Sequence, residues 1–239
     1  EEDIRQKSER VTLDGESRKA LIKQYAPILS LLFISNLLLM ILRDIKEDFL
    51  VNIIDMSNQS SWLFAQIDSI VTLLILVMFA LLTFCKNNMK ALLILMSFVI
   101  VSCLVMTYVS LFHSILELSP ITWLFIMSLS LYVAYLTFQT IFFDRFIACF
   151  KIKGNVGFFI AMIDFIGYTG TASILISKEI FKIETDWFLL FNNMAAIIGC
   201  LCSFLFALAM GLLIKENRRM NPENSYKEVE INTGCLQAI

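Results

Sequence analysis

Six stretches of apolar residues, each close to the length that crosses a bilayer, are separated by short polar segments. A hydrocarbon core about 30 Å thick requires about 20 residues of helix. With 58% hydrophobic and only 17% charged residues, the chain lacks the polar surface of a water-soluble domain. We therefore expect an all-α integral membrane protein with six transmembrane helices. The expected spans are 26–45, 62–84, 91–112, 121–143, 155–177 and 187–214.

Basic residues are concentrated in every second polar segment. Fifteen of the 19 Lys and Arg residues lie before the first span, in the second and fourth loops, or after the last span. Loops rich in Lys and Arg stay in the cytoplasm. We therefore expect a multi-pass protein of the cell membrane, surrounded by the lipid bilayer, with both termini in the cytoplasm. The net charge of −2 gives no indication of a nucleic-acid partner.

Polar segments flank the apolar region at both ends. Residues 1–25 are highly charged, and we expect a cytoplasmic linker that becomes an amphipathic helix leading into the first span. Residues 26–214 would form the six-helix transmembrane domain, and residues 215–239 a disordered cytoplasmic tail. The charged start at Glu1, with no apolar signal core, favours a piece of a longer protein cut at a central linker.

The sequence offers little support for an enzyme. His113 is the only histidine, so a haem held by paired imidazoles, an HExxH zinc site or a Ser-His dyad has little to build on. No pair among the six cysteines has the spacing of metal ligands, and we interpret them as small apolar side chains. We expect no catalytic residue, no cofactor and no bound metal.

Charged residues crowd the end of the first span, in residues 43–48. Helical spacing places Asn36, Arg43 and Glu47 on one stripe. A charge at membrane depth is unfavourable by about 2.5–3.5 kcal/mol on insertion scales unless it is paired or hydrated. Two interpretations stay open. The residues form a cluster at the outer interface, or Arg43 or Asp44 lies on the wall of a central cavity as a substrate contact or gate.

The fourth span carries a polar stripe. Ser128, Tyr132, Tyr135 and Gln139 recur at helical spacing on an otherwise apolar segment, and a helix facing lipid would not carry them. The stripe faces either other helices or water. Packing against neighbouring helices and lining of a cavity are both consistent with it, because tyrosines also form hydrogen bonds across helices.

The fifth span contains a carboxylate well inside the expected bilayer. Asp164 shares a helix face with Tyr168 and Thr171, and small residues on that face permit close helix approach. A carboxylate in this setting either pairs with a neighbour or binds protons reversibly, as a proton-coupled carrier requires. A clamp in which Asp164 accepts a hydrogen bond from Tyr or Asn is the structural alternative. Asp68, in the second span, raises the same question nearer the outer end.

Several motifs together resemble an uncharacterised family of bacterial multi-pass proteins related to the major facilitator superfamily. The similarity extends to Arg43 and Asp44 and to residues 3–10, so it covers most of the chain. The residues that carry it are 131–135 (LYVAY), 142–148 (FFDRFIA), 154–158 (GNVGF), and Asp164 with Gly167, Tyr168 and Gly170.

The resemblance implies two six-helix halves joined by a cytoplasmic linker, with this chain as the carboxy-terminal half and the amino-terminal half as its missing partner. The first and fourth spans end in adjacent opposite charges, Arg43–Asp44 and Asp144–Arg145, which fits a three-plus-three inverted repeat. Asp144 and Arg145 are therefore candidate gating charges, or ordinary interfacial charges. The expected glycines before Tyr132 are absent, so we expect no local break in this helix.

The leading hypothesis is half of an alternating-access secondary carrier for a small polar or amphipathic solute, coupled to protons through Asp164. The alternative is a membrane scaffold or sensor that has kept a degenerate carrier fold and transports nothing. The residues that we expect along the substrate path are Asn36, Arg43, Asp44, Tyr132, Tyr135, Gln139, Asp164 and Tyr168.

Overall fold

The computed structural model describes residues 15–54, 61–150, 156–181 and 186–220, and every regular element in these ranges is a helix. The all-helical class expected from the sequence is therefore confirmed. The elements are α2 (Gly15–Asp48), α3 (Leu50–Ile53), α4 (Ser61–Thr83), α5 (Asn88–Leu111), α6 (His113–Leu116), α7 (Pro120–Thr137), the π-helical segment η1 (Phe138–Phe142), α8 (Phe143–Cys149), α9 (Val156–Phe181) and α10 (Trp187–Met220).

Five helical segments in the described part are long and apolar enough to cross a membrane. They correspond to the expected first, second, third, fourth and sixth spans. The expected fifth span, 155–177, overlaps α9, which is helical but is not one of these five. Five of the six predicted spans are thus found. The five segments are Lys23–Asp48, Trp62–Thr83, Asn88–Leu111, Pro120–Cys149 and Trp187–Met220.

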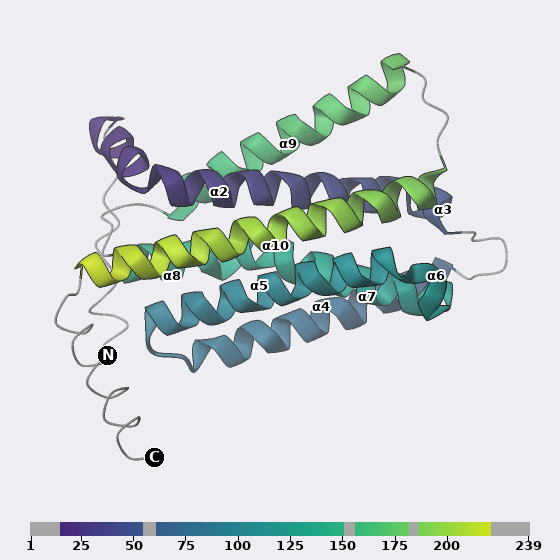
Figure 1. The fold of residues 1–239 in the computed structure, drawn as a ribbon, viewed down its shortest axis with the longest axis horizontal. Coiled ribbons are helices and arrows are strands. Elements are labelled where there is room, and N and C mark those ends of the chain that lie inside the picture. The colour runs from purple at the N-terminus through teal and green to yellow at the C-terminus, as the bar shows by residue number, and fades with distance from the viewer. Residues whose placement is uncertain (1–14, 55–60, 151–155, 182–185, 221–239) are drawn as a thin grey trace.

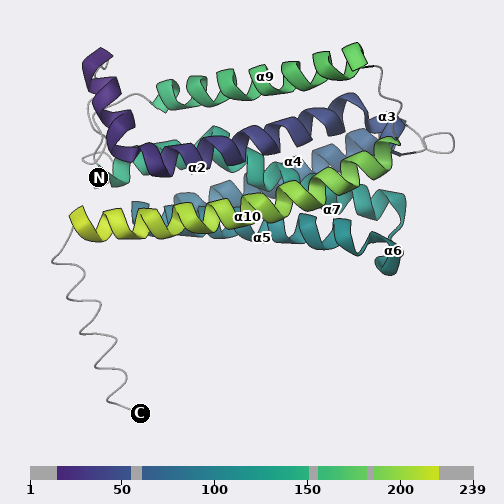
Figure 2. The same cartoon turned by 45° about the horizontal axis from the view of Figure 1, so that its top comes forward.

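The long helices lie side by side in one bundle (Figure 1). α10 packs against both α5 and α2, and α5 packs in turn against α7 and α8. α9 lies on the outer side of α2, and α4 packs against α7 on the other side of the bundle (Figures 1 and 2). We call the end of the bundle at which α2 finishes and α7 and α10 begin the α3 end, and the opposite end the α8 end.

Local sequence signals account for the helix boundaries. The Asn87 side chain accepts a hydrogen bond from the Lys90 backbone N–H at 3.0 Å and caps α5. At the start of α7, Ser119 caps the Thr122 N–H, and Pro120 occupies the first helical position, where no N–H is required. Pro27 lies inside α2 and removes one helical hydrogen bond, which accounts for the bend in this helix (Figure 1).

Aromatic side chains fill the core around η1 and α8. Phe138 of η1 stacks on Phe206 of α10 with ring centroids 5.0 Å apart, and Phe143 of α8 stacks on Phe159 of α9 at 5.3 Å. All four rings are fully buried. They hold the second half of the fourth span between α9 and α10, where tight packing resists displacement.

The fourth span is not a uniform α-helix, because five residues between α7 and α8 adopt π-helical geometry. The helix stays continuous through these residues, so the fourth span has no break, but one turn of it is wider than an α-helical turn. Thr137 donates its hydroxyl hydrogen bond to the Val133 carbonyl at 2.6 Å, and Thr140 donates to Leu136 at 2.7 Å. Hydroxyl donors of this kind satisfy carbonyls near a widened turn without glycine or proline.

Candidate functional site

Arg43 of α2 joins two partners on the inner side of the bundle. Its Nε donates to Asp44 Oδ1 at 2.8 Å, and its terminal nitrogens contact Asp44 and the Tyr135 hydroxyl. The guanidinium carbon also lies 4.5 Å from the centre of the Tyr135 ring. Tyr135, on α7, is buried, and Arg43 and Asp44 are largely buried. A cation held over an aromatic face and paired with a carboxylate is a stable arrangement away from water.

One helical turn closer to the α3 end, Lys46 makes a second set of polar contacts. Its side chain is only 3% exposed, and Nζ lies 3.3 Å from Glu47 Oε1 and 3.7 Å from Asp68 Oδ1. Nζ also donates to the Tyr132 hydroxyl at 3.3 Å and lies 4.5 Å from the centre of that ring. The Tyr132 hydroxyl donates in turn to Glu47. This cluster joins α2, α4 and α7.

The third part of the site connects η1 to α9. Gln139 Nε2 donates to Asp164 Oδ1 at 2.7 Å, with both side chains partly buried. Asp164 and Tyr168 lie close enough to Tyr135 to interact with it electrostatically. We call these three parts together the charged network.

Two glycines bring α9 close enough to α2 to complete the network. A Cβ atom at Gly167 would overlap the Met40 side chain, and one at Gly170 would overlap Leu37. Small residues at such positions allow helix backbones to approach closely. Gly167 and Gly170 thus pack against α2, whereas Gly157 and Ala161, the small residues on the face of Asp164, are exposed.

The charged network is paired but not neutral. It contains the two cations Arg43 and Lys46 and four carboxylates, so its formal charge is −2. Pairing offsets the unfavourable transfer of charges into hydrocarbon, and close aromatic rings offset it further. Two of the carboxylates, Asp44 and Asp164, are partly buried, whereas Glu47 and Asp68 are 43% and 46% exposed; an excess of carboxylate can hold a proton or a cation. The carboxylates are Asp44, Glu47, Asp68 and Asp164.

Not every residue predicted for the substrate path joins this network. Asn36 is 1% exposed, and its amide oxygen and nitrogen have no hydrogen-bond partner in the described part of the chain. Tyr168 is 57% exposed and reaches the network through its electrostatic proximity to Tyr135 and Arg43. The other six predicted residues are Arg43, Asp44, Tyr132, Tyr135, Gln139 and Asp164, and they make the contacts described above.

The two predicted gating charges lie elsewhere, near the α8 end. Asp144 is exposed, and Arg145 donates to Asn88 Oδ1 at 2.8 Å, which ties α8 to the start of α5. Lys46, in contrast, was not among the predicted path residues, although it is the most buried charge of the network. Its presence in the charged run 43–48 was the available signal, but spacing alone does not separate a buried lysine from an interfacial one.

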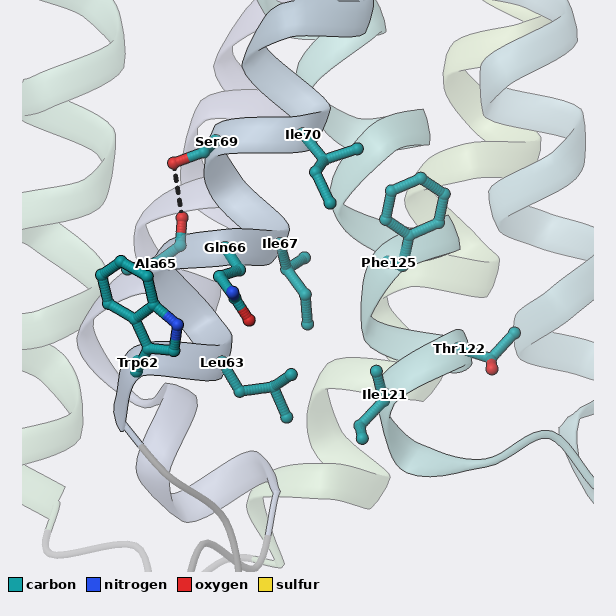
Figure 3. A pocket seen from close by; sticks show the side chains of 10 residues that line it. All are labelled: Trp62, Leu63, Ala65, Gln66, Ile67, Ser69, Ile70, Ile121, Thr122 and Phe125. Carbon is teal, nitrogen blue, oxygen red and sulfur yellow. Dashed lines mark hydrogen bonds between the residues drawn. The ribbon is translucent and has the colours of Figure 1, made fainter.

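A groove of about 690 Å³ runs between α4 and α7 near the α3 end (Figure 3). Trp62, Ile70, Ile121 and Phe125 form most of its apolar wall. Ser69 does not offer its hydroxyl to the groove, because that hydroxyl donates to the Ala65 carbonyl at 2.6 Å (Figure 3). Gln66 and Thr122 also line the groove, so its wall is mostly but not wholly apolar (Figure 3).

The structure and the composition together define the class. Five described helices of spanning length, with a charged network between them, make this an all-helical multi-pass membrane protein. Within the described residues, no three His, Cys, Asp or Glu side chains come together as a metal site.

More specifically, the chain belongs to a family of unknown function (DUF5690), whose family model matches residues 1–216. Neither a curated protein nor a solved structure matches it. The family assigns no activity, and the relation to the major facilitator superfamily stays a prediction.

Proposed function

We propose that this chain is one six-helix unit of an alternating-access secondary carrier for a small polar or amphipathic solute. The observation that carries the proposal is the charged network, in which paired charges and two tyrosines connect α2, α4, the fourth span and α9. Charged side chains inside membrane helices mark substrate and ion pathways more often than they serve packing alone. A second six-helix unit would complete the carrier.

In this proposal α9 also crosses the membrane. It is the fifth span in chain order and completes the set of six. Its 26 residues correspond to a length of about 39 Å, which exceeds the roughly 30 Å of a hydrocarbon core. Asp164 faces η1 and is partly buried there, whereas Tyr168, Thr169 and Ser173 are exposed; the Thr169 and Ser173 hydroxyls donate to backbone carbonyls of α9 itself. Six spans place both termini on one side, and the distribution of Lys and Arg assigns that side to the cytoplasm.

Asp164 is the residue that we assign to proton coupling. As a carboxylate it accepts the hydrogen bond from Gln139, which holds α9 against η1. Protonation removes the negative charge and weakens this contact, so the position of α9 relative to the fourth span depends on the proton. The π-helical turn that carries Gln139 supports this role, because such turns occur frequently at functional sites.

A scaffold or sensor is the second candidate, and one observation favours it. Each charge of the network has a partner: Arg43 pairs with Asp44, Lys46 pairs with Glu47 and Asp68, and Asp164 accepts a hydrogen bond from the neutral amide of Gln139. A self-contained network of this kind also stabilises a protein that transports nothing, because buried charges need partners in any case.

Reconstituted vesicles separate the two candidates. In vesicles that contain the complete carrier with both six-helix units, we expect an imposed proton gradient to drive uptake of at least one solute from a broad panel of radiolabelled amino acids, sugars, organic acids and amines. The Asp164→Asn chain should lose gradient-driven uptake, whereas Asp144→Asn, which changes an exposed carboxylate, should keep it. Uptake that survives Asp164→Asn would refute the coupling role. Absence of both uptake and solute-dependent stabilisation across the panel would favour the scaffold.

A further inference from the structure

A second, smaller cavity lies at the α3 end, separate from the charged network. Its volume is about 210 Å³, and it is partly enclosed by residues of α3, α6, α7 and α10. Ile53, Ile54, Leu118 and Pro120 supply aliphatic walls, and three aromatic rings supply the rest. None of the residues assigned above to the solute path borders this cavity.

The three rings are arranged around Phe188 of α10. The His113 ring meets Phe188 edge to face with centroids 5.7 Å apart, and the Trp123 ring lies 5.1 Å from Phe188 at an angle of 45°. Tilted and edge-to-face rings leave faces and edges available to a further aromatic group. The cavity therefore offers surfaces that suit a planar ring.

Trp123 also brings a hydrogen-bond donor that the protein does not use. The residue is 4% exposed, and its indole Nε1–H has no partner among the described residues. Buried polar groups in folded proteins are nearly always paired, so an unpaired donor on a residue that lines the cavity requires an explanation. The nitrogen itself is covered by protein atoms, so a ligand reaches it only after neighbouring side chains shift. A bound molecule with an acceptor atom would supply the missing partner.

The His113 ring is held in place through its Nδ1 atom. Its Nδ1 lies 3.2 Å from the Ser110 carbonyl and 3.3 Å from Asn192 Nδ2. Asn192 is fixed in turn, because its Nδ2 donates to the same carbonyl at 2.8 Å. Neither contact engages Nε2 of His113. The imidazole is thus oriented by α5 and α10 while keeping one nitrogen for a ligand.

We propose that this cavity binds a single-ring aromatic molecule that carries a hydrogen-bond acceptor, with the acceptor facing the Trp123 indole N–H. Size supports this class, because an apolar protein cavity of about 150 Å³ accommodates benzene. The larger cavity here leaves room for one substituent on the ring. This site does not depend on the carrier proposal.

Benzamide is a suitable probe, since it combines one ring with a carbonyl acceptor. The full chain is labelled with ¹⁵N-tryptophan and reconstituted in lipid nanodiscs, and the Trp123 indole signal is assigned by its loss in Trp123→Phe. We expect benzamide to move this signal downfield along a saturable curve, as a new hydrogen bond requires. Toluene fills the same space without an acceptor, so it should bind without the downfield shift.

Two substitutions on α10, one in the cavity wall and one away from it, test whether benzamide binds in this cavity. Phe188→Ala should weaken benzamide binding at least tenfold, while Phe204→Ala, which removes a ring that is 60% exposed on the same helix, should leave it unchanged. If Phe188→Ala does not fold, Phe188→Leu should weaken binding for the same reason. A shift that grows linearly without saturation, or that is unaffected at Phe188, would overturn the proposal, because it would indicate partitioning into the lipid.

Discussion

At the scale of single residues, the network rests on matched spacing in two facing helices. Arg43 of α2 lies over Tyr135 of α7. Lys46 follows Arg43 by three residues and lies over Tyr132, which precedes Tyr135 by three residues. The opposite order shows that α2 and α7 run antiparallel. Residues three apart share one helix face, so each helix presents its pair toward the other. Tyr132 and Tyr135 of the polar stripe therefore contact α2.

Removal of the Tyr135 hydroxyl tests the strength of this contact. We expect Tyr135→Phe to lower the free energy of unfolding by about 1.5–3 kcal/mol, the range for hydrogen bonds to charged groups, since Arg43 loses a buried partner. Tyr168→Phe, at an exposed tyrosine, should change it by less than about 0.5 kcal/mol. Denaturant titration in mixed micelles measures both. Equal effects at the two positions would show that the contact contributes no stability.

At the scale of elements, close approach of helix backbones sets where side chains meet. A Cβ at Gly199 of α10 would lie 2.8 Å from the Cys103 carbonyl oxygen of α5. Carbonyl groups within a helix cannot move aside as a flexible side chain can, so α10 and α5 must separate if this glycine is replaced. The same principle applies less strictly at Gly167, where the obstacle is the flexible Met40 side chain.

Glycine substitutions on α10 should therefore differ sharply. Gly199→Ala is expected to destabilise the protein by about 1–3 kcal/mol through overpacking. Gly211→Ala meets nothing within 4 Å, and alanine favours helix over glycine by up to about 1 kcal/mol, so it should be neutral or stabilising. Thermal unfolding followed by circular dichroism compares the two variants. A Gly199→Ala chain as stable as Gly211→Ala would contradict the described packing of α10 on α5.

At the scale of the whole molecule, hydropathy alone predicted the all-helical class and six spans, of which five are found, because the bilayer imposes length and composition on each helix. The sequence did not predict which side chains contact one another across helices. Lys46 is buried against Tyr132, which is 86 residues away in the sequence, and the π-helical turn carries no glycine or proline to reveal it. The pairing of Gln139 with Asp164 also needed the arrangement of α9, although both residues were predicted separately.

The topology of the protein in the membrane tests whether α9 crosses the bilayer. If α9 crosses the bilayer, single cysteines at Lys90 and Arg219 should be labelled by an impermeant thiol reagent from the same side, and a cysteine at Asp186 from the opposite side. All three native side chains are exposed. Labelling of positions 90 and 219 from opposite sides would mean an odd number of crossings between them, and the six-span proposal would fail.

The most direct test of the carrier proposal is water access to the network from the two sides of the membrane. Single cysteines replace residues 132, 135, 139, 164 and 168 in a chain whose six native cysteines have been exchanged for alanine. Leu104→Cys, on the outer surface of α5, is the control that should stay protected by lipid. We predict that an impermeant thiol reagent labels the network positions from both sides. Protection of all five positions from both sides would show that they are packing contacts, and the carrier proposal would be withdrawn.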